Sequence, residues 1–95
     1  MANVVITIKI LPSDPEVDID ELYEKALPIL KENGAIIEPD LVRKEVQPIG
    51  FGLSALIIRF LYPESKGNPD VLEDALRTLD NVDEVSIVDV RRAFG

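Results

Sequence analysis

Hydrophobic residues along the chain follow two periods, one typical of strands and one typical of helices. Residues 4–11 place Ile6, Ile8 and Ile10 on one side of an extended chain and polar residues such as Lys9 on the other. This alternation predicts a strand with one buried face. Two prolines directly after the segment end it.

A helix is predicted over the next hydrophobic segment. Asp18 is suited to cap its N-terminus, and Asn33 followed by Gly34 is a stop signal. The residues expected to face the core recur at helical spacing: Ile19, Leu22, Tyr23, Ala26, Leu27 and Leu30. Pro28 lacks a backbone donor and crowds the preceding turn, so we expect a kink or a break near it.

The stretch from residue 35 to 47 has a mixed pattern, because Pro39 and its acidic neighbours separate two hydrophobic pairs. We predict a strand over residues 41–47 at the edge of a sheet, since its run of charged side chains discourages pairing with other chains. Residues 53–62 form the most apolar run and predict a central strand.

The second helix is expected to begin after Asn68, which is followed by a proline and an aspartate. Its core-facing stripe is expected to contain Val71, Leu72, Ala75, Leu76 and Leu79. The last strand is predicted over residues 82–90, with Val85, Ile87 and either Val82 or Val90 toward the core. Residues 91–95 follow as a short tail.

The order of elements is therefore β-α-β-β-α-β, within one domain that spans residues 1–95. Helices that cover one face of a four-stranded antiparallel sheet give each apolar surface a partner layer. We therefore predict an α+β fold, built as a two-layer α/β sandwich.

The net charge and the absence of certain residue types disfavour several classes of function. The chain has 18 Asp and Glu against 10 Lys and Arg, a net charge of −8, and neither His nor Cys. The acidic excess disfavours direct binding to nucleic acid and favours a basic protein partner, although it can also serve solubility alone. Without His or Cys, the commonest general base and thiolate chemistry are missing, so we expect no catalytic residues, no cofactor and no metal site.

No apolar run is long enough to span a bilayer, and no basic segment followed by an apolar one marks a secretory signal. We expect a cytoplasmic protein that makes no contact with membranes and is a monomer when free.

The strongest candidate for a partner-binding site is the segment Pro48-Ile49-Gly50-Phe51-Gly52. Pro48 stiffens the backbone. Gly50 and Gly52 permit positive φ angles and leave bare backbone beside the Phe51 ring. Two roles stay open for that ring. It either folds over the sheet edge and fills the core, or projects as an anchor for a pocket on a partner.

Arg91 and Arg92 are secondary candidates for contact with an acidic or phosphate group on a partner. The alternative interpretation of these two arginines is ordinary surface charge, or pairing with a neighbour such as Asp89.

These features resemble archaeal translation elongation factor one beta, the family that supplies guanine nucleotide exchange to the GTPase that delivers aminoacyl-tRNA. The resemblance covers nearly all of the chain. It is carried by the PIGFGL segment at 48–53, the apolar strand after it, and the ending DVRRAF at 89–94. It implies a ferredoxin-like topology with strand order 4-1-3-2. It also implies that the Phe51 ring inserts into the nucleotide-binding domain of the GTPase, the alpha subunit.

The chain end departs from eukaryotic members, which have a lysine near the C-terminus that disturbs the magnesium site. Arg91 or Arg92 can replace that lysine only in part, because a guanidinium is not a compact point charge. In the implied strand order, the Phe51 segment and the chain end lie at opposite ends of the sheet. Eukaryotic members also carry an N-terminal region that binds other subunits, and we expect no assembly of that kind here.

Two alternatives share the same fold. One is a small-molecule-binding regulatory module, and the other is a passive interaction module that binds the GTPase without changing nucleotide release. Release of GDP from the GTPase distinguishes both alternatives from an exchange factor.

Overall fold

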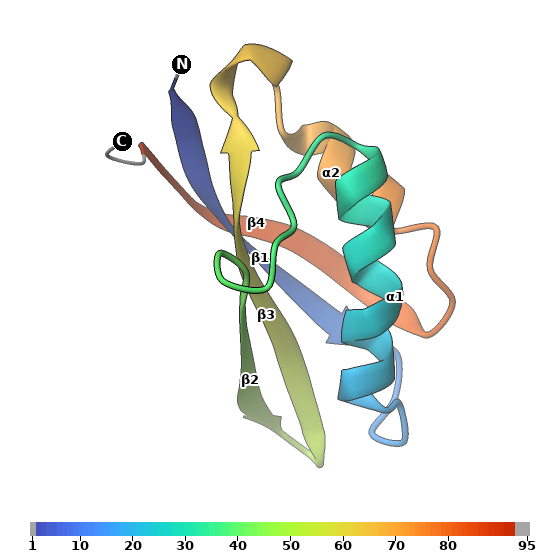
Figure 1. Ribbon diagram of the computed structural model, residues 1–95. Helices are drawn as coiled ribbons and strands as arrows, with labels where there is room; N and C mark the ends of the chain where they lie inside the picture. The colour runs from blue at the N-terminus through green and yellow to red at the C-terminus, as the bar shows by residue number, and fades with distance from the viewer. Residues whose placement is uncertain (1, 93–95) are drawn as a thin grey trace.

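Four antiparallel strands form a single sheet, and both helices lie against one of its faces (Figure 1). The structure, a computed structural model, describes residues 2–92. Its elements are β1 Asn3–Pro12, α1 Ile19–Glu32, β2 Arg43–Gly50, β3 Leu53–Pro63, the short 3-10 helix η1 Glu64–Lys66, α2 Asp70–Leu76 and β4 Val82–Arg92. The strand order β2-β3-β1-β4 confirms the predicted ferredoxin-like β-α-β-β-α-β fold.

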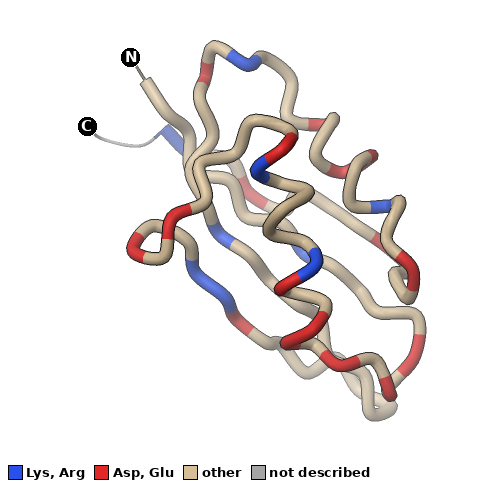
Figure 2. The backbone as a smooth tube through the Cα atoms, turned by 45° about the vertical axis from the view of Figure 1, so that its right-hand side comes forward, with Lys and Arg blue, Asp and Glu red and all other residues tan. Residues whose placement is uncertain are grey.

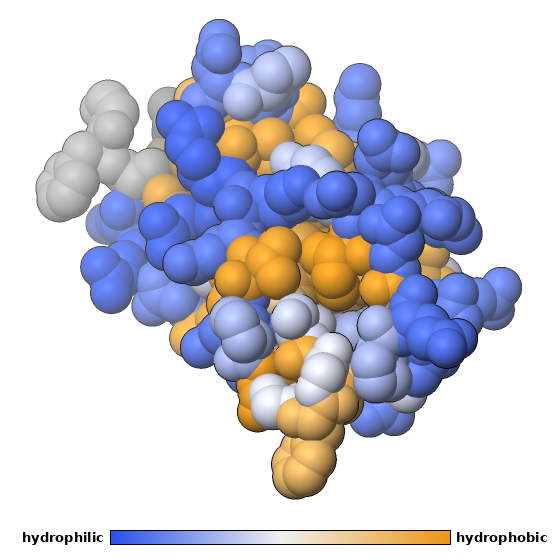
Figure 3. Space-filling view, turned by 90° about the horizontal axis from the view of Figure 1, so that it is seen from below, coloured by the Kyte–Doolittle hydropathy of each residue, from blue (hydrophilic) through white to orange (hydrophobic). Residues whose placement is uncertain are grey.

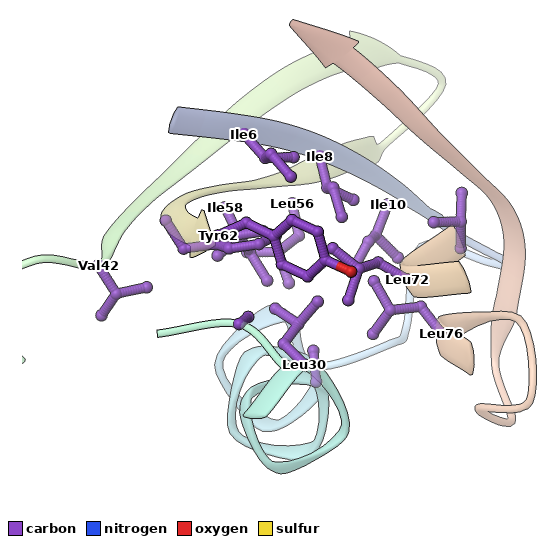
Figure 4. Packing of buried hydrophobic residues seen from close by; sticks show 14 of the residues in the cluster. Ile6, Ile8, Ile10, Leu30, Val42, Leu56, Ile58, Tyr62, Leu72 and Leu76 are labelled. Atoms are coloured by element: carbon purple, nitrogen blue, oxygen red, sulfur yellow. The ribbon is translucent and has the colours of Figure 1, made fainter. Parts of the chain in front are cut away.

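The core fills the space between the sheet and the helices. Ile6, Ile8 and Ile10 of β1 are fully buried because alternate residues of a strand point to the same face. Figure 4 shows these side chains directed toward Leu30 of α1 and Leu72 of α2. The other large members of the core are Leu22, Leu56, Ile58, Phe60, Tyr62, Leu76 and Val85.

Helix α1 begins where the sequence predicts but does not break at Pro28. The Asp18 carboxylate accepts hydrogen bonds from the backbone N–H groups of Asp20 and Glu21, at 3.0 and 3.4 Å, and so caps the first turn. The helix then continues through Pro28 to Glu32. Pro28 lies on the exposed side of the helix, where water can satisfy the carbonyl group one turn earlier that loses its helical donor.

Helix α2 is shorter than its hydrophobic pattern suggested. The Asn68 side chain accepts a hydrogen bond from the Asp70 N–H at 3.0 Å, which confirms the predicted start. Leu72 and Leu76 are buried as expected, and Leu79 packs partly against the core beyond the helix end. The expectation for Val71 was wrong, because its side chain is 49% exposed.

Two strand boundaries also differ from expectation. Strand β2 begins at Arg43 and continues through Pro48 to Gly50, so most of the candidate segment is strand rather than loop. Strand β4 continues to Arg92, so Arg91 and Arg92 are paired strand residues and not a tail. The remaining residues of the expected tail, 93–95, lie outside the described part of the chain.

The register places the Phe51 segment and the last residues of β4 at opposite ends of the sheet, in agreement with the predicted strand order. Arg91 pairs with Val5 near the beginning of β1. The turn after β2 lies beyond Leu56, which pairs with Ile10 near the end of β1. Five residues of strand separate these two positions of β1, about 17 Å at the rise of an extended chain.

The buried isoleucines of β1 should dominate the stability of the fold. Ile8→Ala is expected to lower the free energy of unfolding by about 2–5 kcal/mol, because it leaves a cavity between the sheet and both helices. Val90→Ala, at a strand position that is 49% exposed, should cost less than about 1 kcal/mol. Urea unfolding of both variants measures the difference, and equal losses would contradict this location of the core.

Candidate partner-binding site

A two-residue turn joins β2 to β3 and carries the Phe51 ring. Gly50 ends β2 and pairs with Leu53, the first residue of β3, so only Phe51 and Gly52 lie in the turn. Their φ angles are 55° and 77°. Positive φ at both central residues is the pattern of the type I′ turn, which matches the twist of paired strands. Glycine is usual at such positions, and Phe51 is therefore an unfavourable choice for the turn itself.

The Phe51 side chain is 100% exposed, which excludes the interpretation that its ring fills the core. An added Cβ at Gly50 would meet no atom within 4 Å, so the space on that side of the ring is open. Figure 3 views the molecule from the end that carries this turn and shows hydrophobic surface there, bounded by hydrophilic side chains. The ring thus has the exposure that an anchor for a partner pocket requires.

A bulge directly before the turn sets the direction of Ile49. Pro48 pairs with Ser54 and Gly50 pairs with Leu53, which leaves Ile49 without a partner on β3. Its side chain is 43% exposed. It lines a hollow of about 260 Å³ on the helix-free face of the sheet, together with Lys9, Leu11, Glu84, Ser86 and Val88.

All eight residues of β2 are exposed, because no helix covers this strand. Lys44 joins it to the helix layer: its Nζ lies 2.7 Å from Asp20 Oδ1 and 5.2 Å from the centre of the Tyr23 ring. The hydrogen bond that Lys44 donates to the Asp20 carboxylate raises the pKa of the Lys44 ammonium group above its ordinary value. From the sequence, the charged side chains of β2 were expected only to discourage pairing with other chains. The contact between Lys44 and Asp20 was not predicted, because it depends on the distance between β2 and α1.

Arg91 and Arg92 form local ion pairs, which supports the simpler of the two interpretations for the free protein. Arg91 Nε lies 2.8 Å from Asp89 Oδ2, and Arg92 Nη2 lies 3.1 Å from Glu64 Oε1. Both arginine side chains are at least three-quarters exposed, so the pairs leave the guanidinium groups accessible. The structure does not bring these arginines near Phe51.

Helix α2 holds the bent part of β4 that leads to these arginines. The pairing of β1 with β4 shifts at Thr7/Ile8, and Val88 is left without a partner there. The Ile87 N–H donates to Glu73 Oε2 at 2.7 Å, and Arg77 Nη2 donates to the Val85 carbonyl at 3.2 Å. Side chains of α2 and of Arg77, the residue directly after it, thus satisfy two backbone groups of β4 at and before the bulge.

Within residues 2–92, no three metal-ligating side chains gather into a group that could hold an ion. Every buried side-chain nitrogen and oxygen in that range has a hydrogen-bond partner. No helix in the described residues is long and apolar enough to cross a membrane. The candidate site is therefore the exposed ring and its surroundings.

The fold and the exposed ring define the class of protein. It is a ferredoxin-like domain that presents an aromatic side chain suited to anchor a protein interface. Comparison with known proteins then identifies the family. The sequence model of the EF-1 guanine nucleotide exchange domain matches residues 5–93. The chain belongs to the EF-1 guanine nucleotide exchange domain family, and its function is nucleotide exchange on an elongation GTPase.

Archaeal proteins named elongation factor 1-beta are similar over nearly their whole length. The one from Sulfurisphaera tokodaii is 37% identical over 93 residues, which cover 97% of each chain. The one from Nanoarchaeum equitans is 35% identical over 86 residues, 90% of this chain and 100% of the relative. The one from Methanosphaera stadtmanae is 34% identical over 92 residues, 97% of this chain and 98% of the relative. These similarities confirm the resemblance inferred from the sequence.

Substitution of Phe51 should show that the ring does not stabilise the fold. Phe51→Ala is expected to change the free energy of unfolding by no more than about 0.5 kcal/mol, because a fully exposed side chain loses no buried contact. Phe51→Gly should be more stable than Phe51→Ala by about 1 kcal/mol, because glycine adopts the positive φ without strain. Urea unfolding tests both, and a glycine variant less stable than the alanine variant would contradict the strained turn.

The contribution of the contact between Lys44 and Asp20 to the stability of the fold should decrease at high pH. Because folding raises the pKa of Lys44, its contribution to stability is present below the unfolded pKa and is lost as the pH rises through the folded pKa. The stability difference between wild type and Lys44→Met should therefore persist at neutral pH and shrink in strongly alkaline solution. Lys31→Met is the control. If the stability difference between wild type and Lys44→Met did not change with pH, Lys44 would not be the group whose pKa is raised on folding.

Proposed function

We propose that this protein promotes GDP release and GTP loading on the alpha-subunit GTPase that delivers aminoacyl-tRNA, with Phe51 as its principal contact residue. The observation that carries the proposal is the fully exposed aromatic ring, held at a φ of 55° on a turn where glycine would be more stable. An unfavourable residue at an exposed position indicates a role outside folding.

The proposed mechanism uses binding energy rather than covalent chemistry. In a GTPase, the bound Mg²⁺ neutralises phosphate charge and so helps to retain the nucleotide. A protein that binds the nucleotide-free GTPase more tightly than the GDP-bound form must weaken GDP by the same factor, because binding free energies are linked. GTP then binds by mass action, and the exchange factor leaves unchanged.

Phe51 is suited to supply that differential binding. An aromatic ring that is fully exposed in the free protein gains apolar contact over its whole surface when it enters a pocket. A pocket that opens only when the GTPase deforms would give this energy to the nucleotide-free state alone. The short turn between two paired strands limits the entropy that Phe51 loses on binding.

Arg91 and Arg92 are proposed as a second, weaker contact. In the free protein they pair with Asp89 and Glu64, so contact with the GTPase requires an exchange of partners. Such exposed pairs contribute little to stability and are readily exchanged. A guanidinium binds an anionic group through a planar fork, and this differs from the ammonium of the eukaryotic lysine.

Charge and context complete the proposal. The net charge of −8 favours long-range attraction to a partner that carries basic regions and disfavours direct contact with RNA, whereas the close contacts depend on the charges of the face that docks. The whole chain, residues 1–95, is proposed to act as one exchange domain, monomeric when free and working in the cytoplasm without catalysing a covalent step.

Release of fluorescent GDP from the purified GTPase tests the function. The wild-type protein should accelerate release, and Phe51→Ala should lower the acceleration at least about tenfold, the effect of losing an interface hot spot. Val71→Ala is a matched control, since Val71 is apolar, 49% exposed and on helix α2. It should retain wild-type exchange.

Two outcomes would reject the proposal in different ways. Binding to the GTPase without faster release would identify a passive interaction module. Release at wild-type speed with Phe51→Ala would show that exchange does not depend on the ring.

A further inference from the structure

The helix-free face of the sheet connects the two ends that are proposed to contact the GTPase. Ile49 beside the turn lines a hollow on this face. Arg91 at the other end pairs with Val5, whose neighbour Ile6 points into the core, so both Val5 and Arg91 point to the helix-free side. Ile49 and Arg91 thus lie at opposite ends of the same face. A single partner that contacts both residues must cover the helix-free face between them.

Charge is distributed unevenly between the two faces. Figure 2 shows mainly acidic positions along the helices and their adjoining loops, with some basic ones among them, and both basic and acidic positions in the strands. The paired residues of the helix-free face include four of the ten bases but only three of the eighteen acids. The bases are Lys9, Arg43, Arg59 and Arg91, and the acids are Glu45, Glu84 and Asp89. The acidic excess of the protein therefore lies mainly outside this face.

Two arginines stand directly opposite each other on this face. Arg43 of β2 pairs with Arg59 of β3, and Arg59 pairs in turn with Thr7 at the centre of the sheet. Like charges at directly opposed positions destabilise a sheet. Within residues 2–92, neither arginine forms an ion pair with a carboxylate, in contrast to Arg91.

The hydrogen bonds of these two arginines leave much of their capacity free. Arg43 Nη1 donates to the carbonyl groups of Asp40 and Val42, at 3.1 and 3.2 Å. Arg59 Nε lies 3.4 Å from Thr7 Oγ1, a long hydrogen bond. Arg59 also lines two adjoining hollows, of about 340 Å³ beside Arg43 and about 220 Å³ beside Arg91. An anionic group can thus approach Arg59 from either side.

We propose that the helix-free face is the docking surface for the GTPase and that Arg43 and Arg59 bind carboxylate groups of that partner. The inference rests on the proposed function, since it names the face through which the same partner binds. A carboxylate is favoured over an RNA phosphate for two reasons. The paired residues of this face include no aromatic ring on which a base could stack, and the net charge of −8 opposes a polyanion.

Arg59→Glu tests the docking surface, with Lys31→Glu on α1 as a control of identical charge change. Arg59→Glu places opposite charges across β2 and β3, so its melting temperature should not fall by more than about 2 °C. The concentration of this protein that gives half-maximal acceleration of GDP release should rise about tenfold or more. The reason is that a carboxylate of the GTPase would then face the negative charge of the new glutamate. Lys31→Glu should change it less than about twofold.

Direct binding to the nucleotide-free GTPase separates this proposal from the proposed function. If wild type accelerates release but Arg59→Glu binds no more weakly than Lys31→Glu, the docking surface is wrong and the function stands. If wild type binds without accelerating release and Arg59→Glu binds more weakly, the function is wrong and the docking surface stands. Wild type that does not bind the GTPase would overturn both.

Two further measurements examine other occupants of this face. Fluorescent transfer RNA alone should not bind, and binding that disappears in Arg59→Glu would assign the arginines to phosphates instead. Sedimentation of the free protein should give a monomer for wild type and variant. A wild-type dimer that Arg59→Glu dissociates would assign the face to self-association and overturn the proposal.

Discussion

The packing of the β1 isoleucines against both helices is the interaction on which the rest of the structure depends. β1 lies between β3 and β4, so Ile6, Ile8 and Ile10 stand at the centre of the sheet and are fully buried. The strand period of two that buries them directs the intervening residues to the opposite face. One apolar row thus determines which face the helices cover and which face remains open.

The exposed parts of the protein are supported by this core without belonging to it. β2 has no buried residue and is held by its hydrogen bonds to β3 and by the contact of Lys44 with α1. β3 itself is anchored through Leu56, and a strained turn at its beginning can therefore persist. A short turn on such a strand limits the orientations of the ring, and this suits the role that is proposed for Phe51.

Much of the fold followed from the sequence because its signals are local. The alternation of β1, the cap at Asp18 and the start of α2 after Asn68 each depend on neighbouring residues only, and all were confirmed. The errors arose where tertiary context overrides local preference. Helix α1 does not break at Pro28 because that side of the helix is exposed, and Val71 faces solvent because α2 directs Leu72 and Leu76 to the core.

The candidate site divides in the same way. The sequence by itself determined the order of elements, the acidic charge, and the position of Phe51 between two glycines at a strand end, since residue type and spacing are sufficient for these. Only the tertiary structure decided that the ring is fully exposed, that Lys44 reaches Asp20, and that the arginines of β2 and β3 stand opposite each other. Those facts depend on strand register and on the separation of layers, and residues distant in sequence set both.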